Sequence, residues 1–294
     1  MPAPVLKGFV LAVGAAVLWG VSGTFAQFLF QQRAVNVEWL ITVRMLSTGS
    51  LLLLFAKFGQ KTEATAVWRN KRDAMQLALF SITGMLAVQY TYFAAIKHSN
   101  AATATVLQYA GPVIIAVYLA IKHKRMPRPM EFIAIALAVL GTFLLVTHGN
   151  IHTLSVSALA FFFGIASAFA LAIYTLQPIP LLTKYKSSLV IGWGMLVGGL
   201  VFCFVKAPWD VEGVWDMQSY LSTAFIVIFG TLIPFYAYLT AVKIIGGQKT
   251  SLLASAEPLS ATVVAVLWLN VSFTSMDWLG SLCIISTIFL LSRR

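Results

Sequence analysis

Long apolar runs dominate this chain, and short polar stretches separate them. A membrane-spanning helix needs roughly 20 apolar residues, because a rise of about 1.5 Å per residue must cross about 30 Å of hydrocarbon. Ten runs meet or approach that length, and the ten-residue alternation typical of barrel strands is absent. The pattern predicts an all-α integral membrane protein with ten transmembrane helices, at approximately 7–29, 37–56, 74–96, 101–121, 130–147, 154–177, 187–205, 218–242, 249–269 and 275–292.

An internal repeat divides these runs into two sets of five. A shift of 146 residues aligns 80–146 with 226–292 and pairs Gly84 with Gly230, Tyr92 with Tyr238, Lys97 with Lys243 and Pro112 with Pro258. Earlier spans match more weakly, at a shift near 149–150. We expect two related halves, residues 1–148 and 149–294. Because five is odd, the second half enters the membrane inverted, and inverted repeats place a solute site near the midplane between the halves.

Composition supports the membrane assignment, and charge orients the chain. Of the 294 residues, 60% are hydrophobic and 10% are charged, whereas soluble domains carry roughly 25% charged residues. The net charge of +11 lies in short loops rather than in one basic patch, which argues against nucleic acid as a partner. With a cytoplasmic N-terminus, 16 Lys and Arg residues fall inside and three outside. The positive-inside rule then places both termini in the cytoplasm.

Short motifs at corresponding places in several spans resemble a known family. They are Leu18-Trp19-Gly20 in the first span, Gly111-Pro112 in the fourth and Ala256-Glu257-Pro258 in the ninth. With ten spans in two five-helix repeats, the chain resembles EamA-type members of the drug/metabolite transporter superfamily over nearly its whole length. The Gly-Glu pair that typically ends the fourth and ninth spans of that family is replaced by Lys122-His123-Lys124 and Leu269-Asn270-Val271. The resemblance implies transport of amino acids, amines, carboxylates or related metabolites, often by export.

Two charged residues lie well inside predicted spans, where a charge costs roughly 2.5–3.5 kcal/mol on insertion scales. Arg44 lies about 10 Å below the outer surface and Glu257 about 13 Å above the inner one, at about 1.5 Å per residue. The repeat pairs Arg44 with Trp193 and Glu257 with Gly111, so each charge occurs in one half only. This asymmetry favours a role in binding solute. A purely structural Arg44–Glu257 ion pair is the alternative, and Glu257 is also a candidate proton-coupling residue.

Aromatic and polar residues complete the candidate substrate-binding set: Trp19, Trp193, Tyr90, Tyr236 and Gln108. Aromatic rings can hold a cation or stack on a solute. Tyr92 and Tyr238, near the ends of their spans, are expected at the membrane interface. Proline removes a helical hydrogen bond, so Pro112 and Pro258 are expected to act as paired hinges.

These features favour a secondary-active transporter of small polar metabolites, such as amino acids or amines, by alternating access. Proton coupling, direction, and a monomer or homodimer state remain open. An exporter of lipophilic or quaternary cations and a non-transporting scaffold are the alternatives. We expect no enzyme activity, cofactor, metal site or disulfide, since Cys203 and Cys283 lie in apolar runs and the histidines near run ends. The expected location is the cell (inner, cytoplasmic) membrane, with the lipid bilayer and a small-molecule substrate as partners.

Overall fold

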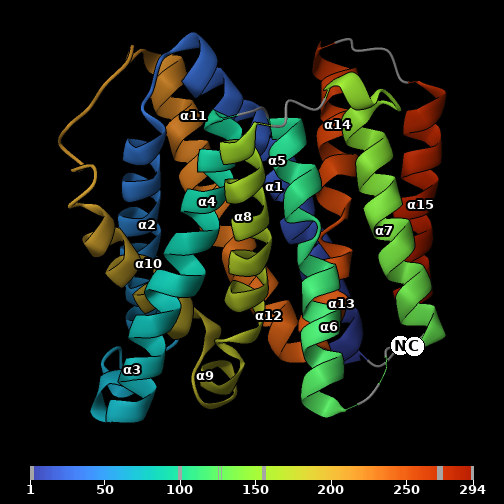
Figure 1. Ribbon diagram of the computed structural model, residues 1–294. Coiled ribbons are helices and arrows are strands. Elements are labelled where there is room, and N and C mark those ends of the chain that lie inside the picture. Colours follow the sequence, from blue (N-terminus) through green and yellow to red (C-terminus); the bar gives the residue numbers. More distant parts are fainter. Residues whose placement is uncertain are drawn as a thin grey trace.

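A computed structural model describes residues 3–98, 101–124, 126, 128–153, 157–269 and 274–292. Over these residues the chain is a bundle of helices without strands (Figure 1). Seven continuous helical segments in the described ranges are long and apolar enough to cross a membrane, and shorter apolar helices accompany them. The all-α membrane architecture predicted from the sequence is therefore confirmed.

The elements up to residue 147 follow the first five apolar runs. They are α1 (Ala3–Gln32), α2 (Val37–Leu54), the π-helix η1 (Phe55–Gly59), the 3-10 helix η2 (Ala66–Arg69), α3 (Lys71–Leu79), the π-helix η3 (Phe80–Leu86), α4 (Ala87–Lys97), α5 (Ala101–Gln108), α6 (Gly111–His123) and α7 (Pro129–Thr147). The third span is thus built from α3, η3 and α4 in succession. The fourth is interrupted at Tyr109 and Ala110, between α5 and α6.

The remaining elements follow the other five runs. They are the 3-10 helix η4 (Ile151–Thr153), α8 (Ala158–Leu176), α9 (Ile179–Lys184), α10 (Ser187–Phe202), α11 (Met217–Val227), the π-helix η5 (Ile228–Leu232), α12 (Ile233–Ile245), α13 (Gly247–Leu253), α14 (Ala256–Leu269) and α15 (Ser275–Ser292). The ninth span is interrupted at Ala254 and Ser255, between α13 and α14. Each interruption lies within three residues of a proline at which we expected a hinge, Pro112 or Pro258.

Polar residues at the ends of the runs fix where several helices begin. Asn36 accepts a hydrogen bond from the backbone N–H of Trp39 at 3.0 Å and caps α2. Ser157 caps α8 and Asp216 caps α11 in the same way. Such caps satisfy backbone N–H groups that have no partner within the helix. A glycine marks the boundary between α12 and α13. Gly246 adopts a φ of +83°, a positive value that glycine reaches without steric cost.

Helix contacts are reciprocal between the first five spans and the last five. α1 packs on α12, α13 and α14, whereas α8 packs on α4, α5 and α6, which are the matching elements of the other set. Two further extensive contacts join elements that correspond in the repeat, α2 with α10 and α7 with α15. Figure 1 shows these two pairs at opposite sides of the bundle.

Small residues allow these pairs to approach closely, as is usual between helices in lipid. A Cβ on Gly141 of α7 would lie 2.9 Å from the carbonyl oxygen of Gly280 in α15, and one on Gly49 of α2 would lie 2.6 Å from the amide nitrogen of Leu196 in α10. No side chain fits in either place. The paired glycines therefore set the spacing of the two pairs of helices at the sides of the bundle.

Candidate substrate site

The buried guanidinium of Arg44 is the first component of the site. α2 carries Arg44 into the bundle with 6% of its surface exposed. Its Nε donates a hydrogen bond to Thr231 Oγ1 at 2.7 Å, and its Cζ lies 5.4 Å from the ring centroid of Phe93. Within the described residues, the two terminal amino groups of Arg44 have no hydrogen-bond partner. The positive charge is thus held in place from one side and left without an anion.

A π-helix explains why Thr231 can receive this hydrogen bond. In η5 the Thr231 hydroxyl donates to the carbonyl oxygen of Ile226, five residues earlier, at 2.8 Å. Its oxygen lone pairs then face Arg44. Short π-helical segments inside α-helices often occur at functional sites. The span of the first half that matches in sequence also contains a π-helix, η3, and the ends of η3 and η5, Leu86 and Leu232, are 146 residues apart.

Glu257 lies at the point where the ninth span is interrupted. It is the second residue of α14, and the positive end of a helix dipole favours a carboxylate there. The hydroxyl of Tyr109 donates to the carbonyl oxygen of Ala254 at 2.6 Å. Because Tyr109 belongs to the interruption of the fourth span, this hydrogen bond joins the two interrupted helices directly. Tyr109 and Tyr92 lie within electrostatic range of the Glu257 carboxyl group.

The first span packs against this point through Trp19 and Gly20. A Cβ on Gly20 would overlap Ser260 Oγ and the carbonyl oxygen of Glu257, so only glycine allows α1 to lie this close to α14. The ring of Trp19 lies 5.3 Å from the rings of both Phe235 and Tyr238. Gly20 therefore packs at the start of α14, and the neighbouring Trp19 packs on α12.

Aromatic residues connect the two charged positions. Phe93, under the Arg44 guanidinium, lies 5.8 Å from the ring of Tyr92. The Tyr92 hydroxyl is 2.9 Å from Thr105 Oγ1 in α5. Arg44 and Glu257 form no ion pair with each other among the described residues. The ion pair that we considered as an alternative is therefore absent from this arrangement of the described residues.

The structure places the other predicted site residues at several different positions. Gln108 is half-buried and ends α5, with Pro112 second in α6 and Pro258 third in α14. The indole of Trp193 instead donates to the carbonyl oxygen of Ala64 at 2.7 Å and packs edge-on against Trp68. Tyr90 contacts Phe163 and Phe202, and Tyr236 contacts Phe55. None of these three aromatic residues has a recorded contact with Arg44 or Glu257 in the described part of the chain.

Three residues at the site were not predicted as members of it. Tyr109, Thr231 and Phe93 contact the charged or interrupted positions directly, but their sequence context is ordinary for a membrane helix. The prediction of an interfacial position is wrong for Tyr238, which is fully buried. Its hydroxyl lies 3.0 Å from Thr175 Oγ1 and its ring stacks on Tyr174. A buried partner hydroxyl removes the need for the polar end of the side chain to reach water.

Known proteins of similar sequence and structure share this architecture. A chain whose crystal structure has been solved superposes with a TM-score of 0.79 at 16% identity, over 97% of this chain and 96% of that one. An uncharacterized inner membrane transporter, YicL of Salmonella typhimurium, is 41% identical over 97% of this chain and 95% of its own length. The threonine/homoserine exporter RhtA of Escherichia coli is 22% identical over 82% of this chain and 77% of its own length.

A family profile covers nearly all of the chain. The profile of the EamA-like transporter family matches twice, over residues 6–147 and over residues 158–293. The resemblance expected from the Trp19, Pro112 and Glu257 motifs is thereby confirmed. The chain is a multi-pass membrane transporter and belongs to the EamA-like transporter family.

Proposed function

We propose that this protein exports small zwitterionic metabolites such as amino acids across the inner membrane by alternating access. The observation that carries the proposal is the Arg44 guanidinium, which is buried and has no anionic partner among the residues that the structure describes. In a membrane such a charge is costly unless it is paired. A solute carboxylate would supply the missing partner. Charge-assisted hydrogen bonds to it contribute roughly 1.5–3 kcal/mol each.

Glu257 is proposed as the site of the coupling proton and as a second contact for the solute, together with Trp19 and Gln108. Discontinuous helices that meet near the bilayer midplane are typical of solute sites in secondary transporters. The Tyr109–Ala254 hydrogen bond brings two such interruptions together. A carboxyl group at this junction can change its charge as the site changes the side to which it opens. Pro112 and Pro258 would serve as the hinges.

Two observations support an inverted-repeat arrangement of residues 1–148 and 149–294. The family profile matches once in each half. The contacts of α1 with α12, α13 and α14 are mirrored by those of α8 with α4, α5 and α6. The charge asymmetry of the loops supports cytoplasmic termini. In Figure 1 the start of α1 and the end of α15 lie at the same end of the bundle, as an even number of spans requires.

The names of two relatives support the substrate class and the location. RhtA is described as a threonine/homoserine exporter, and YicL as an inner membrane transporter. Threonine and homoserine each carry one carboxylate and one ammonium group. A buried arginine and a half-buried carboxylate fit these two groups.

An exporter of lipophilic cations is the second candidate. The tyrosine and tryptophan rings around Glu257 favour it, since such rings and a carboxylate bind organic cations. The unpartnered Arg44 opposes it, because a buried positive charge repels a cation.

Counterflow in proteoliposomes tests the choice between the two candidates. Vesicles with purified protein would be loaded with one unlabelled solute and challenged with a labelled panel of amino acids, amines and quaternary cations. We expect amino acids to exchange, and Arg44→Ala to slow their exchange roughly tenfold or more while folded protein remains in the membrane. Arg69→Ala, which removes an arginine from the surface, is the matched control. Exchange of cations alone, undiminished in Arg44→Ala, would favour the second candidate.

A further inference from the structure

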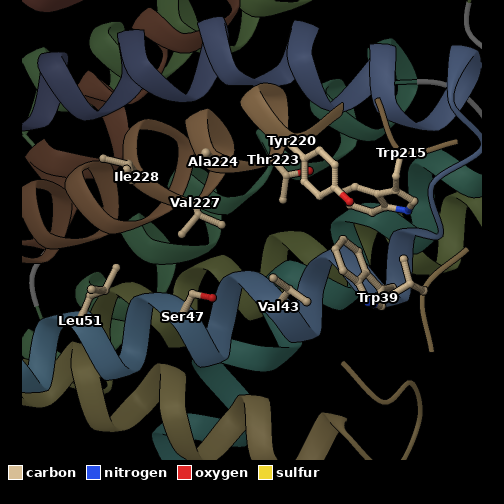
Figure 2. A pocket seen from close by; sticks show the side chains of 11 residues that line it. Trp39, Val43, Ser47, Leu51, Trp215, Tyr220, Thr223, Ala224, Val227 and Ile228 are labelled. Atoms are coloured by element: carbon tan, nitrogen blue, oxygen red, sulfur yellow. The ribbon is translucent and has the colours of Figure 1, made fainter. Parts of the chain in front are cut away.

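A cavity of about 580 Å³ lies between α2 and α11, apart from the candidate substrate site. Figure 2 shows Val43, Ser47 and Leu51 of α2 on one wall, opposite Ala224, Val227 and Ile228. None of its eleven lining residues is charged. The polar atoms on its walls are those of hydroxyl and indole groups. An ion or a zwitterion would therefore find no partner here, and the lining suits hydrocarbon.

The cavity is elongated along the direction in which the helices cross the membrane. Trp39 lies at one end and Leu51 at the other, twelve residues further along α2. At about 1.5 Å per residue that is about 18 Å, more than half of the roughly 30 Å of hydrocarbon. The groove thus extends from one edge of the bilayer past its middle.

Aromatic residues at the end near Trp39 are held by hydrogen bonds to the loop that precedes α11. The indole of Trp39 donates to Pro208 O at 2.9 Å, and that of Trp215 donates to Glu212 O at 3.1 Å. The two rings meet edge-on at 4.8 Å. Since both N–H groups are already bonded, the rings contribute apolar surface to the groove. Tryptophan in such a position is typical of the membrane–water interface.

The rim of the groove is continuous with the lipid-facing surface. Leu51 is 43% exposed on one side and Ile228 is 41% exposed on the other. Leu54 and Phe229 extend the exposed apolar surface on each side. In a bilayer this surface contacts acyl chains. The bilayer therefore supplies an occupant for the groove, namely the acyl chain of a neighbouring lipid.

We propose that this groove binds one acyl chain of a bilayer phospholipid. The acyl chain lies between α2 and α11, with its ester end beside Trp39 and Trp215. Lipid tails gain no hydrophobic free energy on leaving other lipid tails, so the preference for the groove comes from packing. Binding of this kind survives mild detergent extraction and is lost on extensive delipidation.

Photolabelling of the protein in nanodiscs tests this proposal. The probe is a phosphatidylethanolamine with a diazirine near the middle of one acyl chain, and labelled residues are mapped by mass spectrometry. We expect labelling to concentrate at residues 43–51 and 224–228. It should exceed the labelling of Leu282 and Ile285, which are exposed apolar residues of α15. Equal labelling of the two regions would overturn the proposal.

Substitutions that fill the groove can be compared with a substitution outside it. Ala224→Trp should lower labelling of residues 43–51 severalfold, because the indole occupies the space of the chain. Leu221→Trp places the same side chain on the same helix at a position that is exposed but does not line the groove, and it should leave the labelling unchanged. Ser47→Phe fills the groove from the other wall, should Ala224→Trp fail to fold. Undiminished groove labelling in a folded filling variant would also overturn the proposal.

Discussion

At the scale of single residues, Arg44 and Thr231 determine how the buried positive charge is oriented. Arg44 carries a charge that needs a partner, and the Thr231 hydroxyl satisfies only its Nε. The hydroxyl in turn depends on the carbonyl group of Ile226 within η5. This chain of two hydrogen bonds fixes the direction of the guanidinium and leaves its terminal amino groups available to a solute.

Replacing Thr231 tests whether the guanidinium must be held. Thr231→Val keeps the shape but removes the acceptor and leaves Arg44 Nε buried without a partner. An unsatisfied buried group costs roughly 1–3 kcal/mol, so we expect a lower melting temperature and slower solute exchange. Thr231→Ser restores the oxygen and should restore both properties. Identical behaviour of the valine and serine variants would show that the hydrogen bond does not matter.

Glu257→Gln tests the proton-coupling role. Glutamine keeps the size and hydrogen bonding of the side chain but cannot release a proton. We expect the variant to lose accumulation driven by a pH gradient and to keep counterflow between equal pools, which needs no net proton movement. Driven uptake, exchange and melting temperature would be measured on the same reconstituted protein.

Two other outcomes would assign Glu257 differently. A parallel loss of both transport modes would mean that it holds the solute ammonium group through a charge-assisted contact. Lower thermal stability with both modes intact would mean a packing role. Accumulation driven by a pH gradient at the wild-type rate would rule out the proton role.

The sequence identified the charged members of the site but not their partners. Arg44 and Glu257 can be found from sequence because a charge within an apolar run is costly wherever the fold places it. Tyr109 and Thr231 cannot, since their importance comes from contacts with residues 145 positions later and 187 positions earlier. Trp193 matches Arg44 in the repeat, but its indole donates to the carbonyl oxygen of Ala64 and packs on Trp68, since the position in the repeat does not decide the contacts.

At the scale of the elements, the interrupted helices and π-helices distinguish this bundle from a set of plain spans. Pro112 and Pro258 marked the interruptions in advance, because proline cannot complete the helical hydrogen-bond pattern. The π-helices η3 and η5 were not foreseen, since no residue type requires a π-helix. The ten apolar runs correspond to the helices with boundaries shifted by a few residues, because hydrophobicity fixes the buried length and local caps fix the ends.

Gly20 tests the contact between α1 and the start of α14. Gly20→Ala would place a methyl group against the carbonyl oxygen of Glu257. Overpacking of this kind costs typically about 1–3 kcal/mol, so we expect a lower melting temperature and impaired transport. Gly23→Ala is the matched control, because a Cβ there meets nothing within 4 Å. Its stability should be unchanged or slightly raised, as alanine favours helix more than glycine does. Equal effects of the two substitutions would contradict the proposed contact.

At the scale of the whole molecule, the reciprocal contacts of α1 and α8 suggest how the protein works. If each half packs on the matching elements of the other, the bundle can adopt a second arrangement in which the roles of the halves are exchanged. Each of the two arrangements would open the site to a different side of the membrane. Arg44 and Glu257 each occur in one half only. Near the middle of the membrane, each would contact the solute in both arrangements.

Membrane topology is a direct test of this arrangement. The loop charges predict that a reporter fused after Arg294 lies in the cytoplasm and that one inserted at Gly149 lies on the opposite side. Paired alkaline phosphatase and fluorescent-protein fusions distinguish the two locations. A C-terminal reporter on the outside would contradict the orientation, and two reporters on the same side would contradict the inverted repeat.

The central claim, that Arg44 binds the carboxylate of the solute, is tested most directly by changing the protein and the solute together. Counterflow would be measured for threonine and for threonine amide, which lacks the carboxylate, in wild-type protein and in Arg44→Ala. One lost charge-assisted contact of roughly 1.5–3 kcal/mol corresponds to a roughly 10- to 150-fold preference for the acid in the wild type. The account predicts that this preference disappears in Arg44→Ala. A folded Arg44→Ala protein that still prefers threonine by the wild-type factor would contradict it.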